Sequence, residues 1–359
     1  MVEGLPDTVC TVHSDPNILD ESTWYWGDWQ NHHQYQAACD SAYEQLTLIH
    51  GPAEFPSDGV TVVCAARNEA NLLPSFLAHY RGLGVGRIHV IDNSSDDQTR
   101  DIASSWPGTT VWTTSASFAV AAGGQLWRAA IVRRHGLGNW VLNVDVDEHL
   151  VYDGMDRRDI RSLCAWLQSR QQTRLFAPLI DMYPGSARTS LLARLKRVFL
   201  DKLADESMLK HCPYFDRREL SGSANYEFQK TSNGIHVRGG VRSRVIAEPS
   251  EDVFCLSKVP LALWDEETAY CNMHFPFPFS CNPHQNHGAL LHFKFTGDFR
   301  AKVSAAIQEK QYWKESYEYR LYERWLRTGR SLFDEQYSVR YRGPGSLISQ
   351  GLLRPIAWS

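Results

Sequence analysis

Three carboxylates fall close together in the middle of the chain: Asp145, Asp147 and Glu148. They follow a short apolar run, Trp140 to Val144, whose length and β-branched content are typical of a buried parallel strand. Because side chains alternate between the two faces of a strand, Asp145 and Asp147 are expected to point one way and Glu148 the other. Two such acids form a hard oxygen site for a divalent cation, and that cation can hold a diphosphate. The same residues also suit a solvated acidic turn, so the surrounding elements are needed to distinguish a metal site from such a turn.

Composition narrows the classes of protein. The chain has 359 residues, 43% of them hydrophobic, which allows one large domain or two smaller ones. A net charge of -4 argues against a nucleic-acid partner. No apolar run approaches the roughly 18 residues of a transmembrane span, and no signal-peptide pattern opens the chain. The eight cysteines form no Cys-x-x-Cys pair, which favours reduced thiols in a cytoplasmic protein over disulfides or a zinc site.

The elements around the acids alternate between strand and helix patterns. The predicted strands cover 60–66, 87–91, 110–113 and 140–144, and the predicted helices cover 71–83, 98–104 and 125–135, the first of them capped by Asn71. The alternation predicts an α/β fold with a doubly wound, mostly parallel sheet and helices on both faces. Ligands bind such sheets outside the carboxyl ends of the strands. Arg67-Asn68-Glu69 and Asp92 follow the first two strands, so they join the acids as candidates.

The remaining segments divide into an arm, a main domain and a tail. Residues 1–58 are expected to be irregular and to include an aromatic cluster at 24–29 that packs on a main domain of residues 59–298. Within that domain, a strand at 174–180 is expected to end in Asp181. The basic amphipathic segment 188–200 suits a helix packed on the domain, and peripheral contact with an anionic membrane is the alternative interpretation. Residues 299–328 indicate one long helix, followed by a tail to residue 359.

Four motifs stand in one order along the chain: Ala66-Arg-Asn-Glu69, Ile91-Asp-Asn-Ser-Ser-Asp-Asp97, Asn143-Val-Asp-Val-Asp-Glu-His-Leu150 and Leu290-Leu-His-Phe-Lys-Phe295. In this combination the chain resembles bacterial glycosyltransferases of the family 2-like group, which have the GT-A fold, a Rossmann-like nucleotide-sugar transferase fold. It is most similar to the branch that carries Asp-Val-Asp-Glu in place of the commoner Asp-x-Asp, and it is also similar to family 92. The resemblance covers about residues 58 to 320.

The resemblance implies a role for each motif. Arg67, Asn68, Glu69 and Asp92 are expected to hold the nucleotide. Asp145, Asp147 and His292 are expected to ligate Mn²⁺ or Mg²⁺, with Asp145 also near the ribose or donor sugar, and Lys294 to neutralise phosphate. The resemblance also implies a nucleotide-sugar donor, which is expected to be UDP-linked, a hydroxyl acceptor such as a glycan of polysaccharide biosynthesis, and inversion at the sugar carbon. The base that activates the acceptor has no clear counterpart among the four motifs. Asp181, at the end of a predicted strand, is the first candidate and Glu148 is the second, and Asp181 suits equally a cap of the turn at 182–185.

Two other functions remain open on the residues alone. A nucleotidyltransferase shares a related sheet and acid pair, but such enzymes usually carry a Gly-rich loop after the first strand, and Arg67-Asn68-Glu69 has no glycine. A non-catalytic sugar-nucleotide or glycan-binding protein built on a decayed transferase is the other alternative. His274 and the Arg242/Arg244 group are expected to line the acceptor side of the cleft. A zinc cluster of His274, His284 and His287 fits no standard ligand spacing.

Overall fold

The computed structural model describes residues 32–185, 208–219, 225–231, 234–247, 254–270 and 274–358. The aromatic cluster at 24–29 and the basic segment 188–200 therefore lie outside the described residues.

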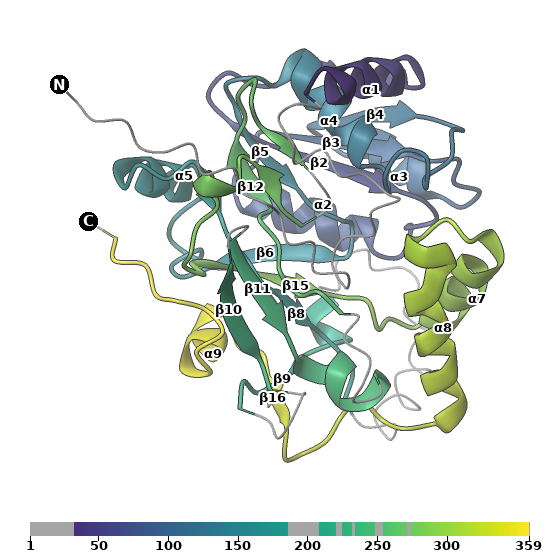
Figure 1. The fold of residues 1–359 in the computed structure, drawn as a ribbon, viewed down its shortest axis with the longest axis vertical. Coiled ribbons are helices and arrows are strands. Elements are labelled where there is room, and N and C mark those ends of the chain that lie inside the picture. The colour runs from purple at the N-terminus through teal and green to yellow at the C-terminus, as the bar shows by residue number, and fades with distance from the viewer. Residues whose placement is uncertain are drawn as a thin grey trace.

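A seven-stranded sheet forms the centre of the molecule, in the order β1–β4–β3–β2–β5–β12–β7 (Figure 1). Strands β2, β3, β4 and β5 are parallel to one another, whereas β1 pairs antiparallel with β4, and β12 pairs antiparallel with β5 and β7. The strands are β1 (Thr47–His50), β2 (Val60–Ala66), β3 (Arg87–Asp92), β4 (Thr109–Thr113), β5 (Trp140–Asn143), β7 (Arg174–Leu175) and β12 (Leu261–Leu263).

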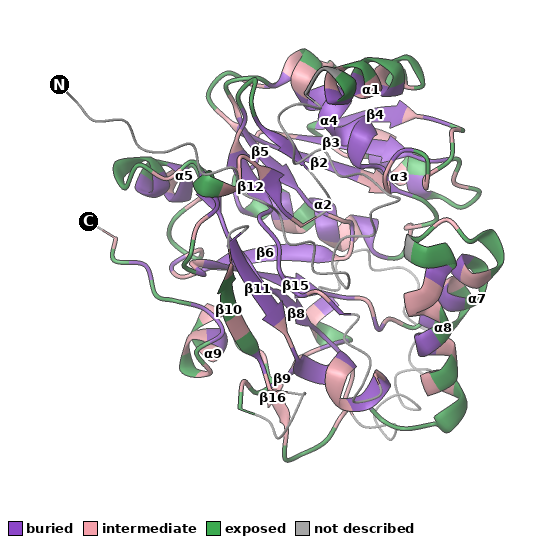
Figure 2. Ribbon diagram, viewed as in Figure 1, coloured by how far each residue is buried: buried purple, intermediate pink, exposed green. Residues whose placement is uncertain are grey.

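Helices cover both faces of this sheet. Val62 of β2 belongs to a buried apolar cluster that includes residues of α2 (Leu73–Gly82), α3 (Thr99–Ser105) and α5 (Ile160–Ser169). Its neighbour Val63 faces the opposite way, into a second cluster built with α1 (His32–Glu44) and α4 (Gln125–His135). The near-continuous burial of β2 and β3, visible in Figure 2, is what a parallel strand covered on both sides requires. The predicted α/β class, with a mostly parallel sheet and helices on both faces, is confirmed.

A smaller, three-stranded sheet lies beside the first, in the order β6–β15–β8. It consists of β6 (Glu148–Tyr152), β15 (Gly288–His292) and β8 (Leu179–Asp181). Strand β15 is central, antiparallel to β6 and parallel to β8, and its register places His292 opposite both Glu148 and Asp181. Three residues that lie far apart in the sequence are thereby fixed side by side.

Two predicted strands differ from the observed ones. Asp145 and Asp147 do not continue a strand, because β5 ends at Asn143 and the chain turns, with the Glu148 N–H donating to the Asp145 carbonyl, before β6 begins. The expectation that the two acids share a strand face is therefore wrong. The predicted strand 174–180 is divided into β7 and β8, which belong to different sheets; Pro178 lies in the break and has no N–H to donate to a ladder.

The chain ends also differ from the expectation. Within the part of residues 1–58 that is described, α1 and β1 are regular, because Tyr35, Cys39 and Ala42 repeat at helical spacing and pack against α4. The single helix expected at 299–328 is two, α7 (Phe299–Glu309) and α8 (Trp313–Thr328), which pack on each other (Figure 1). Asn71 does not cap α2 with its side chain, which instead donates to Asp298 at 3.3 Å.

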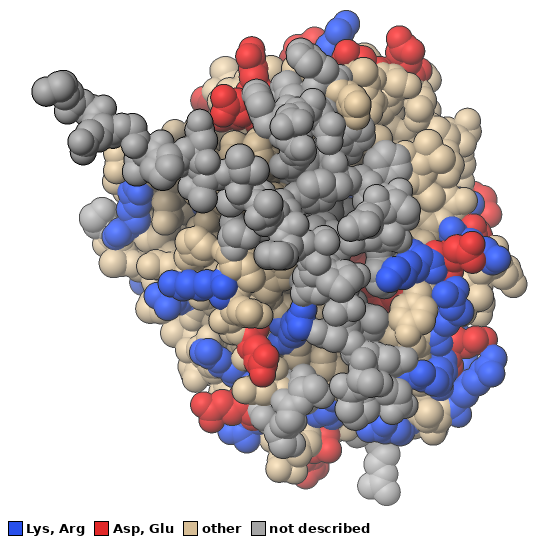
Figure 3. Space-filling view, in the orientation of Figure 1, with Lys and Arg blue, Asp and Glu red and all other residues tan. Residues whose placement is uncertain are grey.

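Smaller elements complete the described part of the chain. They are β9 (Tyr214–Asp216) paired with β16 (Ser338–Arg340), the hairpin of β10 (Glu227–Thr231) and β11 (Gly234–Arg238), β13 (Ala269–Tyr270) paired with β14 (Pro276–Phe277), α9 (Pro344–Ser349), and helical turns at Met208–Lys210, Arg242–Ile246 and Phe279–Cys281. None of the helices in the described ranges is both long and apolar enough to cross a bilayer. On the face drawn in Figure 3, outside the grey region, lysines and arginines are interspersed with acids.

Candidate functional site

The loops that follow β2 and β3 are joined to each other. The Asn68 N–H donates to the Ser95 hydroxyl at 3.0 Å, and the Asp96 N–H donates back to Asn68 Oδ1 at 2.9 Å. The Glu69 N–H donates to the Thr99 hydroxyl at 2.7 Å. Asn68 has a φ of 57°, a left-handed conformation that asparagine tolerates better than most residues. The structure therefore brings the Arg67-Asn68-Glu69 loop and the Asp92 loop together at the carboxyl edge of the sheet.

Asp92 itself is buried beneath Arg100. The Arg100 guanidinium donates to Asp92 Oδ2 through Nε at 3.1 Å and Nη2 at 2.9 Å, while the Ser95 N–H reaches Oδ1 at 3.3 Å. Asp92 thus organises its own loop. Its contact with a nucleotide remains a prediction.

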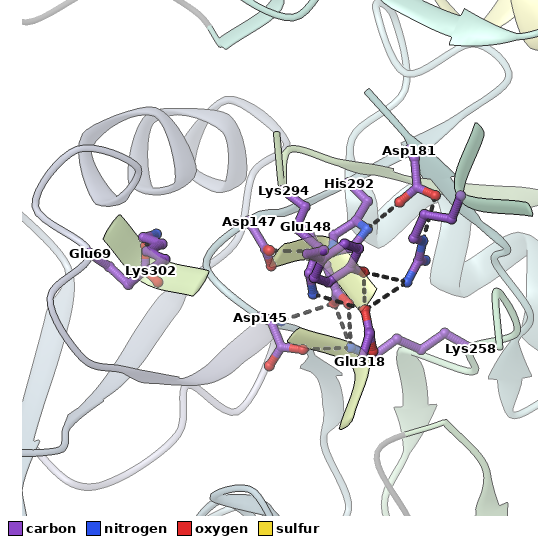
Figure 4. Close-up of polar contacts among 12 residues, drawn as sticks. Glu69, Asp145, Asp147, Glu148, Asp181, Lys258, His292, Lys294, Lys302 and Glu318 are labelled. Atoms are coloured by element: carbon purple, nitrogen blue, oxygen red, sulfur yellow. Dashed lines mark hydrogen bonds and ion pairs between the residues drawn. The ribbon is translucent and has the colours of Figure 1, made fainter. Parts of the chain in front are cut away.

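Asp145 and Glu148 share two buried cations. Arg128 of α4 donates to Asp145 Oδ1 at 2.5 Å and, through its other terminal nitrogen, to Asn143 at 3.0 Å. The Lys258 ammonium lies 2.6 Å from each Glu148 oxygen and 3.2 Å from Asp145 Oδ2. The Asp145 N–H also donates to Glu148 Oε2 at 2.9 Å. Two carboxylates and two cations therefore form one compact cluster. Figure 4 shows Lys258 with its contacts to Asp145 and Glu148.

The charges of this cluster are strongly coupled. Burial alone would raise the pKa of Asp145, but Lys258 and Arg128 lower it well below the usual range. Burial raises the pKa of Glu148, and Lys258 opposes that rise. Burial lowers the pKa of Lys258, whereas the two carboxylates raise it above its ordinary value. Asp145 is therefore ionised and already neutralised by protein cations. Its predicted role as a metal ligand is untested, and both of its oxygens have partners.

Asp147 begins a second chain of contacts that runs through His292 to Asp181 (Figure 4). His292 Nε2 lies 3.2 Å from Asp147 Oδ2, and His292 Nδ1 lies 2.7 Å from Asp181 Oδ1. The Arg242 Nε donates to the other Asp181 oxygen at 2.7 Å. Asp181 is fully buried, with both oxygens occupied, so it is placed to orient the His292 ring.

Burial and charge set the protonation of this chain. Burial would lower the pKa of His292, but Asp147 and Asp181 raise it to about 9. Burial would raise the pKa of Asp181, but Arg242 and His292 lower it to about 2. The pKa of Asp147, which burial would also raise, is lowered below its usual range by His292 and then by Lys294. A cation bound by both side chains would take the place of the proton on His292 Nε2.

Two lysines flank Asp147 from the C-terminal elements. Lys294 follows β15; it lies 3.6 Å from Glu318 of α8 and stands over the rings of Tyr319 and Tyr322. Lys302 of α7 donates to Glu69 at 2.6 Å. Burial raises the pKa of Glu69 to about 7, although the contact with Lys302 opposes this rise. Asp147 also raises the pKa of both lysines, after larger contributions from their nearer partners.

The donor atoms of Asp147 and His292 fit a divalent cation. Two ligands at right angles, each about 2.1 Å from Mg²⁺ or Mn²⁺, are separated by about 3 Å, which compares with the 3.2 Å between Oδ2 and Nε2. Among the residues that the structure describes, no group of three or more His, Cys, Asp or Glu is placed to hold a metal ion. A cation here would therefore rely on two protein ligands and complete its shell with phosphate oxygens and water, as Mg²⁺ commonly does.

Several residues of the site were not anticipated from the sequence. Arg128, Lys302 and Glu318 come from three helices, and Lys258 comes from a later segment and lies between the two acids Asp145 and Glu148. An i, i+4 spacing links Glu318 to Tyr322 and Asp298 to Lys302, but it does not indicate which face of a helix meets the site.

The chain is similar to known proteins at the level of solved structures. No family model matches the chain, and no curated protein matches it. Among solved structures it is similar to glucosyl-3-phosphoglycerate synthase from Mycobacterium tuberculosis in complex with Mn²⁺, UDP and glucosyl-3-phosphoglycerate, at 20% identity over 53% of this chain and 60% of that one, with a TM-score of 0.22. It is also similar to a mannosyltransferase from Pyrobaculum calidifontis in complex with GDP-Man and Mn²⁺, at 18% identity over 44% of this chain and 48% of that one, with a TM-score of 0.24. The chain spans less than two thirds of either protein, and a likeness of this extent transfers no activity.

Proposed function

We propose that this protein is a glycosyltransferase that moves a sugar from a nucleotide-sugar donor to a hydroxyl acceptor with the help of Mn²⁺ or Mg²⁺. The observation that carries the proposal is the approach of Asp147 Oδ2 and His292 Nε2 to 3.2 Å at the carboxyl edge of a parallel sheet. Lys294 and Lys302 lie close enough to Asp147 for its charge to raise the pKa of both ammonium groups. They would supply positive charge to a diphosphate held there.

The finer assignments belong to the same proposal. The four sequence motifs support a GT-A fold of the family 2-like group, a UDP-linked donor and inversion at the sugar carbon. A metal bound by Asp147 and His292 would stabilise the negative charge that develops on the leaving diphosphate. The Arg67-Asn68-Glu69 loop, joined to the Asp92 loop, would hold the nucleoside. We place the catalytic domain at residues 59–298, in the cytoplasm, with Lys302 and Glu318 contributed by the C-terminal helices.

Asp181 is better suited to positioning His292 than to the role of base. A base has to reach the acceptor hydroxyl directly or through one water, but Asp181 is fully buried and both of its oxygens are occupied by His292 and Arg242. Glu148 is similarly buried against Lys258. The base role predicted for these two carboxylates is untested, and their contacts favour structural roles for both.

Donor hydrolysis is the experiment that tests the proposal. Purified protein is incubated with UDP- and GDP-linked hexoses, with Mn²⁺ or with a chelator, and nucleoside diphosphate release is measured. We expect metal-dependent release in the wild type and a loss of at least about 100-fold in Asp147→Ala, because charge stabilisation at the reacting centre typically contributes this much. Asp156→Ala, which changes an exposed acid of the same domain, is the matched control.

Other outcomes distinguish the alternatives. Release that persists in chelator and in Asp147→Ala would remove the metal role. Pyrophosphate release from a nucleoside triphosphate would identify a nucleotidyltransferase. Donor binding with no turnover across an acceptor panel would identify a binding protein.

A further inference from the structure

Glu318, on α8, is a carboxylate of the site that the proposed function leaves without a role. Its Oε1 accepts hydrogen bonds from the Arg242 Nη1 at 3.3 Å and from the Tyr322 hydroxyl. The Lys294 ammonium lies 3.6 Å from the same oxygen. No hydrogen bond reaches Oε2 from the part of the chain that the structure describes. One oxygen therefore anchors the side chain, and the other is left for a further partner.

Arg242 joins Glu318 to the candidate metal site. The Arg242 Nε donates to Asp181 Oδ2 at 2.7 Å, and Asp181 Oδ1 lies 2.7 Å from His292 Nδ1. A single guanidinium thus holds both Glu318 and the residue that orients the candidate metal ligand. This shared contact fixes the carboxylate of α8 relative to the metal site, as a catalytic group requires.

Glu318 has the access to solvent that the two base candidates predicted from the sequence do not have. Its side chain is 29% exposed, whereas the side chains of Asp181 and Glu148 are 0% and 3% exposed. A general base has to reach the acceptor hydroxyl directly or through one water. Glu318 offers a partly exposed side chain and an oxygen available for this contact.

The position of Glu318 relative to the Arg67-Asn68-Glu69 loop also suits a base. Figure 4 shows Asp147 between Glu69 and Glu318. A donor whose nucleoside is held at the Glu69 loop and whose diphosphate is held at Asp147 would extend its sugar towards Glu318. When a sugar carbon is inverted, the acceptor enters opposite the leaving group, and its base stands on that face of the ring.

Neighbouring cations keep Glu318 ionised. Burial would raise the pKa of its carboxyl group, but Lys294 and then Arg242 lower that pKa below its ordinary value. The side chain is therefore a carboxylate at neutral pH, the form that accepts a proton.

We propose that Glu318 is the general base that activates the acceptor hydroxyl, an inference that rests on the proposed function. Glu318 Oε2 takes the hydroxyl proton while the acceptor oxygen forms its bond to the sugar carbon. The bond from that carbon to the diphosphate oxygen breaks, and its electron pair stays on the diphosphate. The proton then leaves Glu318 for solvent. When water takes the place of the acceptor, the same step hydrolyses the donor.

Donor hydrolysis with Mn²⁺ tests this role without a known acceptor. We expect Glu318→Gln to lower the rate of nucleoside diphosphate release by at least about 100-fold, the usual contribution of a general base. Calorimetric binding of Mn²⁺ and the released nucleoside diphosphate should stay at the wild-type affinity, which reports an intact donor site. Glu323→Gln is the matched control, because Glu323 lies on the same helix, is exposed and pairs only with Arg327 among the described residues.

Azide distinguishes a base from a structural carboxylate. The azide anion carries no proton, so its attack on the sugar carbon needs no base. We expect azide to restore nucleoside diphosphate release in Glu318→Ala and to give a glycosyl azide detectable by mass spectrometry. It should restore nothing in Asp147→Ala, which lacks the proposed metal ligand.

The outcomes separate this inference from the proposed function. Metal-dependent hydrolysis in the wild type, with Glu318→Gln within about threefold of it, would overturn the base role and leave the proposed function standing. Release that azide does not restore in Glu318→Ala would also overturn the base role. A wild type that hydrolyses no donor would overturn both.

Discussion

Replacing Lys258 with methionine removes the cation that Asp145 and Glu148 share. Methionine keeps much of the length of lysine, so the main change is the loss of charge between two carboxylates that lie 3.2 Å and 2.6 Å from the ammonium. Asp145 keeps Arg128, but Glu148 is left as a buried carboxylate without its cation. Breaking a buried ion pair on one side costs about 3–5 kcal/mol, because an uncompensated charge remains. We expect Lys258→Met to lower the free energy of unfolding by that amount at pH 8.

The pH dependence has a defined sign. Without Lys258, the pKa of Glu148, which burial already raises, rises further above that of the unfolded chain. Between the unfolded pKa of about 4.3 and the higher folded pKa, the folded state binds more protons, so stability increases as pH falls. The deficit of Lys258→Met relative to the wild type should therefore shrink as the pH is lowered from 8 towards about 5.

A double variant provides the control. Urea unfolding can be followed by the fluorescence of the 12 tryptophans. Adding Glu148→Gln to Lys258→Met replaces the unpaired carboxylate with a neutral amide, so we expect recovery of about half the loss. A loss below about 1 kcal/mol in Lys258→Met, or a double variant no more stable than the single one, would refute the structural role of this pair.

Three further predictions concern other parts of the molecule. Asp92→Asn should weaken calorimetric binding of the free nucleoside diphosphate as much as that of the whole donor, and unchanged nucleotide affinity would contradict its placement. Phe293→Ala should lower the free energy of unfolding by about 3–5 kcal/mol in urea titrations because the ring is buried against His149, and a loss under about 1 kcal/mol would contradict that packing. Burial lowers the pKa of His89 to about 3, whereas the unfolded chain binds this proton near pH 6.5. The contribution of His89 to the free energy of unfolding is therefore complete above about pH 6.5 and is lost as pH falls, by about 2 kcal/mol at pH 5. His89→Gln should flatten this part of the stability profile, and an unchanged slope would show that His89 is not its source.

Much of the main sheet could be predicted from local pattern. Strand β2 begins and ends at the predicted residues, as does α4, because each carries an apolar pattern long enough to distinguish strand from helix. The smaller sheet could not be predicted in this way. Its register joins His292 to Glu148 and Asp181 across long stretches of sequence, and no local pattern specifies such a pairing.

The site was predictable to a similar extent. The motifs indicated Asp147, His292 and Lys294, and these do converge, because β15 lies beside β6 and the Phe293 N–H donates to the Asp147 carbonyl. The roles assigned to Asp145 and Glu148 depended on charges that the sequence does not place. Arg128 lies on a helix and Lys258 on a later segment, and only the folded chain brings both to the same carboxylate.

The most direct test of the account is a crystal structure with Mn²⁺ and a nucleoside diphosphate, with the metal located by anomalous scattering. We predict one Mn²⁺ peak within about 2.3 Å of both Asp147 Oδ2 and His292 Nε2, with diphosphate oxygens completing its coordination. His292 Nδ1 should remain hydrogen-bonded to Asp181. A structure in which the nucleotide is bound, its metal is held elsewhere, and His292 is out of reach of both metal and diphosphate would contradict the proposed metal site.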